Sequence, residues 1–307
     1  MIWNKLLRAE PLVALDMGSS ALKMAEVVPT AGRVLLRRCA IVPVQGQDYG
    51  QSLKKLLSET GIQRRRVSLG LASPEVIVKP FKFPRMPKPE LEKAVLLQAE
   101  QAILSDYSLN DVTIDAHLLP PYSNGSIHGL FVVVPKKVLA ARLEAAQSVG
   151  LNPLIVDVEG LALWNAYWML EGRRESAPKT VLLINVGAHT TNVVIAKGPD
   201  ELVLVRDFHL GAQAIEKGQE KDWITEVGDS LGYARSECGL RSLDAAYVTG
   251  GGSSRVASQS LESVLSLPVR PWNPLKHVVR GPQSRSLEES KGVQLTVAIG
   301  LALRRLE

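Results

Sequence analysis

One repeated pattern constrains the fold of this chain more than any other feature. At residues 12–27 an apolar run breaks at a short turn of small residues and then resumes (LVALDMGSSALKMAEV), and residues 180–196 repeat the pattern (TVLLINVGAHTTNVVIA). Two apolar runs that flank a tight turn predict a β-hairpin. The second copy, far along the chain, predicts a protein built from two related halves.

The first turn carries residue types that suit phosphate chemistry. Gly18, Ser19 and Ser20 are small, so the backbone can curl until several N–H groups converge on an anion. Asp16 can hold a metal-bound water, and Lys23 can reach a phosphate oxygen. Ordinary hairpin turns use the same residue types, so this turn alone is a weak indication of a binding site.

Two further turns strengthen the indication of a phosphate-binding site. The second hairpin places Asn185 and Gly187 where the first has Asp16 and Gly18. A third turn, at residues 250–252 (GGG), directly follows an apolar run. A turn of small residues after an apolar run thus occurs three times in the chain.

Composition narrows the class of protein. The chain has 307 residues, 46% of them apolar and 22% charged, which is enough for two domains of ordinary soluble character. Cys39 and Cys238 are the only cysteines, and the five histidines are scattered, so neither a disulfide framework nor a zinc site is expected. No apolar run reaches the length of a membrane span. Although the net charge is +5, aromatic residues make up only 5%, which disfavours nucleic acid as a partner.

The order of predicted elements also suggests two halves. The first hairpin, a third strand and a helix give β-β-β-α. Residues 66–150 then predict β-β-α-β-β-α, which we interpret as an inserted subdomain. A breaker-rich connector at residues 173–178 precedes the second half. The polar stretch at residues 276–291 is predicted to be a loop.

Several motifs together resemble the type IV pilus assembly protein PilM family, which is related to the cell-division protein FtsA. The resemblance covers essentially the whole chain, and Pro84–Gln101 is its most specific part. The motifs are DMGSSALKMAEV, VIVKPFKFPRMPKPELEKAVLLQAEQ, GLNPLIVDVEGLAL, NVGAHTTNVVI, TGGGSSRV, WNPLKHV and AIGLALRR.

The resemblance implies an α/β, actin/Hsp70-like (ribonuclease H-like) fold of two halves. In that scheme residues 10–65 form subdomain 1A, completed by residues 151–175 and 292–307. Residues 66–150 form the inserted subdomain 1C, and residues 178–291 form subdomain 2A with a reduced subdomain 2B.

The family also implies partners and a location. Its members lie on the cytoplasmic face of the inner membrane and bind the N-terminal cytoplasmic tail of the bitopic membrane protein PilN, between subdomains 1A and 1C. They connect that protein to the pilus motor, so the motor ATPase, the platform protein and a second copy of the chain are further candidate partners. Individual peptide contacts are not implied by the sequence.

The family's nucleotide site carries over residue by residue. Asp16 is expected to face Mg²⁺ through a water, and the remaining positions are expected to contact the phosphates or the nucleoside of ATP. These are Gly18, Ser19, Ser20, Lys23, Asn185, Gly187, His189, Thr190, Thr191, Gly250, Gly251 and Gly252.

Two departures from the family pattern predict weak nucleotide use. Asn185 stands where an Asp is expected, which removes a charge and a proton acceptor. In the same turn, His189 stands where relatives have a small residue, and its ring can crowd the terminal phosphate or hydrogen-bond to it, of which crowding is the favoured expectation. The second departure is the short interval between Gly211 and Cys238, so one wall of the cleft is expected to be reduced.

Two functions stay open from the sequence. The first is a scaffold with weak or absent ATP binding, favoured by Asn185 and the short second half. The second is an active ATPase, which the Asp16–Lys23 turn keeps open. Scaffold and ATPase share one fold, which does not decide between them. A counterpart in type II secretion or competence, and an FtsA-like membrane filament, are less favoured alternatives.

Overall fold

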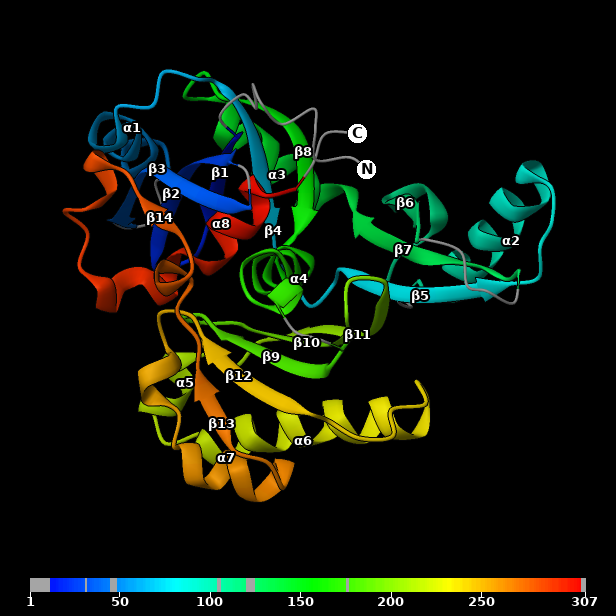
Figure 1. The fold of residues 1–307 in the computed structure, drawn as a ribbon. Coiled ribbons are helices and arrows are strands. Elements are labelled where there is room, and N and C mark those ends of the chain that lie inside the picture. The colour runs from blue at the N-terminus through cyan, green and yellow to red at the C-terminus, as the bar shows by residue number, and fades with distance from the viewer. Residues whose placement is uncertain are drawn as a thin grey trace.

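Three β-sheets, with helices between and around them, make up the protein (Figure 1). The computed structural model describes residues 12–30, 32–44, 49–103, 106–119, 125–174 and 177–304. None of the helices within these residues is long and apolar enough to cross a membrane.

The first sheet has six strands in the order β14-β3-β2-β1-β4-β8. The expected hairpin forms its centre: β1 and β2 pair antiparallel, with Asp16 opposite Lys23. On the other side of β1, β4 and β8 run parallel. The strands are β1 (Leu12–Met17), β2 (Ala21–Thr30), β3 (Arg33–Pro43), β4 (Arg66–Leu71), β8 (Asn152–Val158) and β14 (Val279–Arg280).

The second sheet has five strands in the order β11-β10-β9-β12-β13 and repeats this topology. Its hairpin, β9 with β10, is antiparallel, and β12 runs parallel to β9 just as β4 runs parallel to β1. The two-half organisation expected from the sequence is therefore confirmed. The strands are β9 (Thr180–Val186), β10 (Thr191–Lys197), β11 (Glu201–Phe208), β12 (Ala245–Thr249) and β13 (Val269–Pro271).

Two apolar helices, α4 (Glu159–Leu170) and α8 (Thr296–Ala302), lie between the two sheets (Figure 1). They cross closely because Gly300 has no side chain, and a Cβ there would overlap the backbone of Ala162. Side chains from both sheets bury against this pair in one continuous core. The helices thus hold the two halves together.

Other helices cover the outer faces of the two sheets. On the first sheet these are α1 (Tyr49–Thr60) and α3 (Lys136–Gln147), and on the second α6 (Glu220–Ser236) and α7 (Ser258–Leu265). Between β11 and β12 the chain forms only α5 (Ala212–Glu216) and α6, over residues that are all described. Short 3-10 segments lie at Leu109–Asp111, Gly172–Arg174, Ser253–Arg255, Pro274–Lys276, Pro282–Ser284 and Glu289–Leu295.

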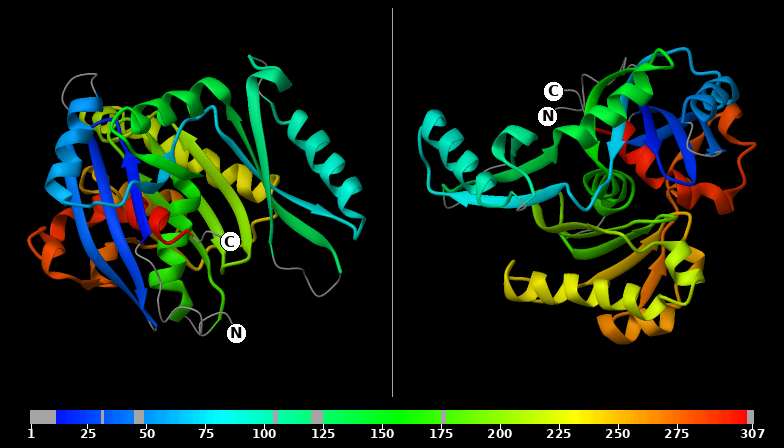
Figure 2. Two further views of the ribbon diagram at one scale, coloured as in Figure 1. Left: turned by 90° about the horizontal axis from the view of Figure 1, so that it is seen from above. Right: turned by 180° about the vertical axis from the view of Figure 1, so that it is seen from behind.

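The third sheet, β5-β7-β6, carries α2 on one face and projects from the body, as both views in Figure 2 show. We call this unit the insertion. It has its own core, in which Phe81, Leu91 and Phe131 are buried. Its elements are β5 (Ile77–Phe83), α2 (Lys88–Glu100), β6 (Val112–Leu118) and β7 (Ile127–Pro135).

The insertion is smaller than the range 66–150 expected from the sequence. The strand β4 lies inside the first sheet, where it pairs with β1 and β8. The helix α3 packs Leu143 and Ala146 into the core beneath that sheet. Both elements therefore belong to the first half, because their apolar side chains are buried there.

The polar stretch 276–291 differs from its expected loop structure. Within it, β14 pairs parallel with β3 and extends the first sheet by a strand. Residues 279–280, expected in the second half, thus contact the first.

Candidate functional site

The first turn joins β1 to β2 and contains Gly18, Ser19 and Ser20. Asp16 is 3% exposed at the end of β1, and its Oδ2 lies 3.2 Å from the Nζ of Lys23. The other carboxylate oxygen of Asp16, Oδ1, is buried and has no hydrogen-bond partner among the described residues. Lys23 therefore neutralises part of the charge, while one oxygen is left for a further ligand.

The first and second turns touch directly. The hydroxyl of Ser19 and Nδ1 of His189 are 2.8 Å apart, although 170 positions separate the two residues. Both side chains, like that of Ser20, are exposed. The ring of His189 thus lies between the two turns expected to cradle phosphates.

The second turn joins β9 to β10 and is closed by a backbone hydrogen bond from the Gly187 N–H to the Thr190 carbonyl, 2.9 Å. Asn185 is 8% exposed and donates through Nδ2 to Oδ1 of Asn192, 2.6 Å. Its side chain is therefore engaged within the second sheet.

The third turn follows β12 and packs against the second. Gly250 has φ +93°, a conformation that favours glycine, and a Cβ there would lie 2.5 Å from Oδ1 of Asn185. The Gly252 N–H donates to the Val186 carbonyl, 2.8 Å. Gly251 lies against Gln294. The tertiary structure thus brings all three turns together.

Thr191 is placed differently from its neighbours in the turn. Its side chain is fully buried, donates to the Leu210 carbonyl at 2.6 Å and accepts from the Trp223 indole N–H at 2.9 Å. The hydroxyl thus donates one hydrogen bond and accepts another inside the second half. The structure assigns Thr191 to holding α6 on the sheet.

Glu159, which the sequence analysis does not single out, also faces this cleft. It begins α4, is 8% exposed, and burial raises its pKa to about 8. The charge of Asp16 raises that pKa further, whereas Lys23 and Arg142 oppose the shift. A sequence signal exists: Glu159 is the one charged residue of an otherwise largely apolar helix.

Together these groups fit a hydrated divalent cation and a phosphate only in part. Asp16 offers a buried, unpartnered oxygen, and Glu159 adds a second carboxyl near it. Asn185 offers no charge. Among the residues that the structure describes, no three His, Cys, Asp or Glu side chains cluster as metal ligands.

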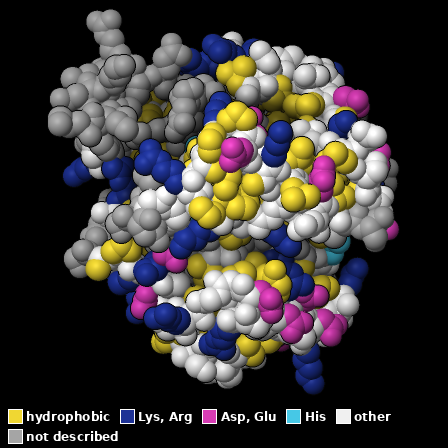
Figure 3. Space-filling view, turned by 90° about the vertical axis from the view of Figure 1, so that its right-hand side faces the viewer, with side chains coloured by type: hydrophobic (Ala, Val, Ile, Leu, Met, Phe, Trp, Pro, Cys, Tyr) yellow, Lys and Arg dark blue, Asp and Glu magenta, His cyan; other side chains and the backbone are white. Residues whose placement is uncertain are grey.

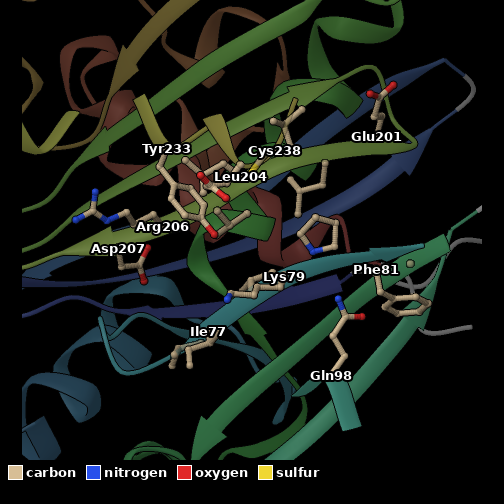
Figure 4. Close-up of a pocket in the computed structure, with 18 of the residues that line it drawn as sticks. Ile77, Lys79, Phe81, Gln98, Glu201, Leu204, Arg206, Asp207, Tyr233 and Cys238 are labelled. Carbon is tan, nitrogen blue, oxygen red and sulfur yellow. The ribbon is translucent and has the colours of Figure 1, made fainter. Parts of the chain in front are cut away.

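Two cavities flank the insertion. The larger, about 1070 Å³, lies between the edge strands β5 and β11 and includes residues of α6 (Figure 4). The smaller, about 410 Å³, lies between β6 of the insertion and β8 and α4 of the first half. We call the smaller cavity the β6–β8 groove. Figure 3 views the protein from the side of the insertion, where apolar side chains lie among charged ones. Leu96 and Leu97 of α2 are both exposed.

The β6–β8 groove is lined by apolar and polar side chains and includes one ion pair. Val156, Leu161 and Leu130 supply apolar surface. Nη1 of Arg304 lies 3.2 Å from both carboxylate oxygens of Asp157, which is 5% exposed. Burial raises the pKa of Asp157, and the charge of Arg304 opposes that rise.

This architecture is similar to that of known proteins. The family model of the type IV pilus assembly protein PilM matches residues 14–221. A solved PilM–PilN type IV pilus biogenesis complex is 25% identical, with a TM-score of 0.80 over 95% of this chain and 97% of that one.

More distant structures show the fold alone. The cytoplasmic domain of EpsL from the type II secretion system of Vibrio cholerae is 14% identical, with a TM-score of 0.51 over 97% of both chains. A Bacteroides thetaiotaomicron protein with an actin-like ATPase fold is 12% identical, with a TM-score of 0.51 over 89% of this chain and 94% of that one. The actin-like fold expected from the sequence is therefore confirmed. Because the family model matches well over half of the chain, the chain belongs to the type IV pilus assembly protein PilM family.

Proposed function

We propose that this protein is a scaffold of the type IV pilus assembly platform and binds the N-terminal tail of a PilN-type membrane protein in the β6–β8 groove. The observation that carries the proposal is the likeness, over 95% of the chain, to a PilM solved in complex with PilN. The groove also lies between the first half and the insertion, where the family resemblance expects the peptide.

The groove suits an extended peptide. Both β6 and β8 are edge strands of their sheets, so each has one edge of backbone N–H and C=O groups that no neighbouring strand pairs. A peptide that lies along such an edge gains main-chain hydrogen bonds, while alternate side chains enter the cavity. Its volume of about 410 Å³ accommodates a few side chains.

A blocked groove tests the proposal. Thr113 on β6 is exposed, lines the cavity and pairs with Val134, which also lines it, so Thr113→Trp narrows the cavity. Leu97→Trp, on the exposed face of α2 away from the cavity, is the matched control. In a fluorescence titration with a synthetic PilN-type N-terminal peptide, we expect Thr113→Trp to weaken binding at least about tenfold, or about 1.4 kcal/mol. Equal binding by the two variants would exclude this groove.

Such a partner would hold the protein at the cytoplasmic face of the inner membrane. We further propose that the pilus motor ATPase, the platform protein and a second copy of this chain are binding partners. Co-sedimentation with vesicles that carry the PilN-type protein, compared with bare vesicles, tests the membrane attachment. We expect the protein to sediment only with the former.

A second proposal concerns nucleotide. Because the three turns converge and Asp16 has an unpartnered buried oxygen, the cleft retains weak binding of Mg²⁺-ATP. In that complex Asp16 would hold the hydrated cation, and the backbone of the first turn would contact the phosphates. Asn185 and the Ser19–His189 contact keep turnover near background. Calorimetric titration with Mg²⁺-ATP and a phosphate-release assay test this, and robust turnover by the unmodified protein would contradict it.

A further inference from the structure

Three polar side chains form a ladder across neighbouring strands of the second sheet. The strand register places Asn185 beside Asn192, and Asn192 beside Asp207. Nδ2 of Asn185 donates to Oδ1 of Asn192 at 2.6 Å, and Nδ2 of Asn192 donates to Oδ1 of Asp207 at 2.8 Å. Asn185 and Asn192 are 8% and 1% exposed, so little water can replace these bonds.

The carboxylate at one end dictates the direction of every bond. An ionised Asp207 can only accept hydrogen bonds, so Asn192 must turn its NH₂ group toward it. The carbonyl oxygen of Asn192 then faces Asn185, which must in turn present its own NH₂ group. The two ends of an asparagine amide have nearly the same shape, so charge, rather than packing, sets the orientation.

The far end of the ladder reaches the cleft. With its NH₂ committed to Asn192, Asn185 directs Oδ1 toward the third turn, where a Cβ on Gly250 would lie 2.5 Å away. Asn185 therefore presents an acceptor oxygen to the third turn. An Asp at this position would do the same but would also carry a negative charge. In this protein the negative charge lies two strands away, at Asp207.

We propose that Asp207 is the positioning residue of the second turn, orienting Asn192 and through it Asn185, and that the ladder accepts one carboxylate only. This inference does not depend on peptide or nucleotide binding. Asn185 is thus part of a directional hydrogen-bonded ladder. An Asp at position 185 fits this ladder only if Asp207 is replaced by an amide.

The surroundings of Asp207 agree with an ionised carboxylate at neutral pH. Burial raises its pKa to about 6, and hydrogen bonds from Asn192 and from the Ser73 backbone oppose that rise. Asp207 lies on the β11 side of the larger cavity, with Ile77 and Lys79 on the opposing strand β5 (Figure 4). The negative charge of Asp207 also contributes to the raised pKa of Glu159 on α4.

A single exchange at position 185 should break the ladder. In Asn185→Asp, both ends are acceptors, and Asn192 has one NH₂ group and one oxygen with which to face them. One carboxylate then meets the oxygen of Asn192 in a buried site, which is unfavourable. Adding Asp207→Asn restores a consistent ladder of reversed direction, in which Asn192 donates to the introduced carboxylate at position 185 and no longer to position 207.

A double-mutant cycle tests the proposal on the full chain. Urea unfolding at pH 7.5 compares the unmodified protein, Asn185→Asp, Asp207→Asn and the double variant. We expect Asn185→Asp to raise the equilibrium constant of unfolding at least about tenfold, and Asp207→Asn to reverse most of that change in the double variant. Asp229→Asn, at an exposed acidic residue that lines the same cavity, is the matched control and should give no rescue.

A spectroscopic readout separates orientation from mere stability. Side-chain amide NMR resonances of Asn185 and Asn192 should shift in Asp207→Asn and stay unchanged in Asp229→Asn. If Asn185→Asp does not fold, recovery of folded protein in the double variant supports the proposal, and failure of both overturns it. Additive effects of the two exchanges, or equal rescue by Asp229→Asn, also overturn it.

Discussion

The hydroxyl of Ser19 and the imidazole Nδ1 of His189 meet at 2.8 Å, one from each of the two turns that the family resemblance assigns to phosphate binding. The contact spans the mouth of the cleft and joins its two halves. A phosphate that entered between the turns would have to displace it. The weak nucleotide binding that we propose thus has a specific cause in the geometry.

Removal of the His189 ring is expected to improve nucleotide binding. His189→Ala abolishes the contact and opens the space between the turns, so affinity for Mg²⁺-ATP should rise up to about tenfold, the equivalent of one hydrogen bond. Calorimetric titration measures it. His209→Ala, at another exposed histidine of the second half, should leave affinity unchanged. A lower affinity in His189→Ala would instead place the ring among the groups that bind nucleotide.

Loss of the ion pair in the β6–β8 groove is expected to destabilise the fold. Arg304→Met leaves the buried carboxylate of Asp157 without its cation, so the free energy of unfolding should fall by about 2 kcal/mol. Arg255→Met breaks an exposed pair with Glu216 and should cost under about 0.5 kcal/mol. Urea denaturation compares the two variants. If both lose equally little free energy of unfolding, the Asp157–Arg304 pair does not stabilise the fold.

Stability is expected to fall as pH rises from about 5 to 8, in part because of Glu159. Its pKa is about 8 in the folded protein against an ordinary value of 4.5, so the folded state holds the proton more tightly. Below pH 4.5 both states are protonated. Above it the unfolded chain ionises first, and the stabilising difference disappears as pH passes through 8.

Glu159→Gln should therefore flatten this pH dependence and raise stability at pH 8 by about 1 kcal/mol or more. Glu92→Gln, at an exposed residue of α2, should keep the original slope. Urea denaturation at several pH values measures both. An unchanged slope in Glu159→Gln would contradict a raised pKa for this group.

Thr191 is expected to affect stability without affecting ligand binding. Thr191→Val leaves the buried Trp223 indole N–H and the Leu210 carbonyl unpaired, so the free energy of unfolding should fall by about 2–3 kcal/mol. Affinity for Mg²⁺-ATP, measured at a temperature where the variant is folded, should stay unchanged. A selective loss of affinity would instead place the hydroxyl in the cleft.

Much of the architecture was predictable because it depends on local patterns. An apolar run, a turn of small residues and a second run specify a hairpin wherever they occur, and the two copies at residues 12–27 and 180–196 form β1–β2 and β9–β10. The repeated order of elements then predicted two matching sheets. Convergence of the turns was expected from the actin-like fold that the family resemblance implies.

The limits of the insertion were not predictable in the same way. Alternating apolar residues identify β4 as a strand but do not say which sheet it joins, and it pairs with β1 and β8. The apolar face of α3 could equally cover either sheet. The short β14 forms only because β3 offers a free edge to a polar segment.

By itself, the sequence determined the hairpins, the turn residues and the chemical types in the cleft, because these depend on neighbours along the chain. Only the tertiary structure decided which groups face one another. Ser19 meets His189, Glu159 approaches Asp16, and Asp207 orients Asn185 through Asn192. Such contacts join strands and helices far apart in sequence, and their hydrogen-bond directions depend on charges that no local pattern records.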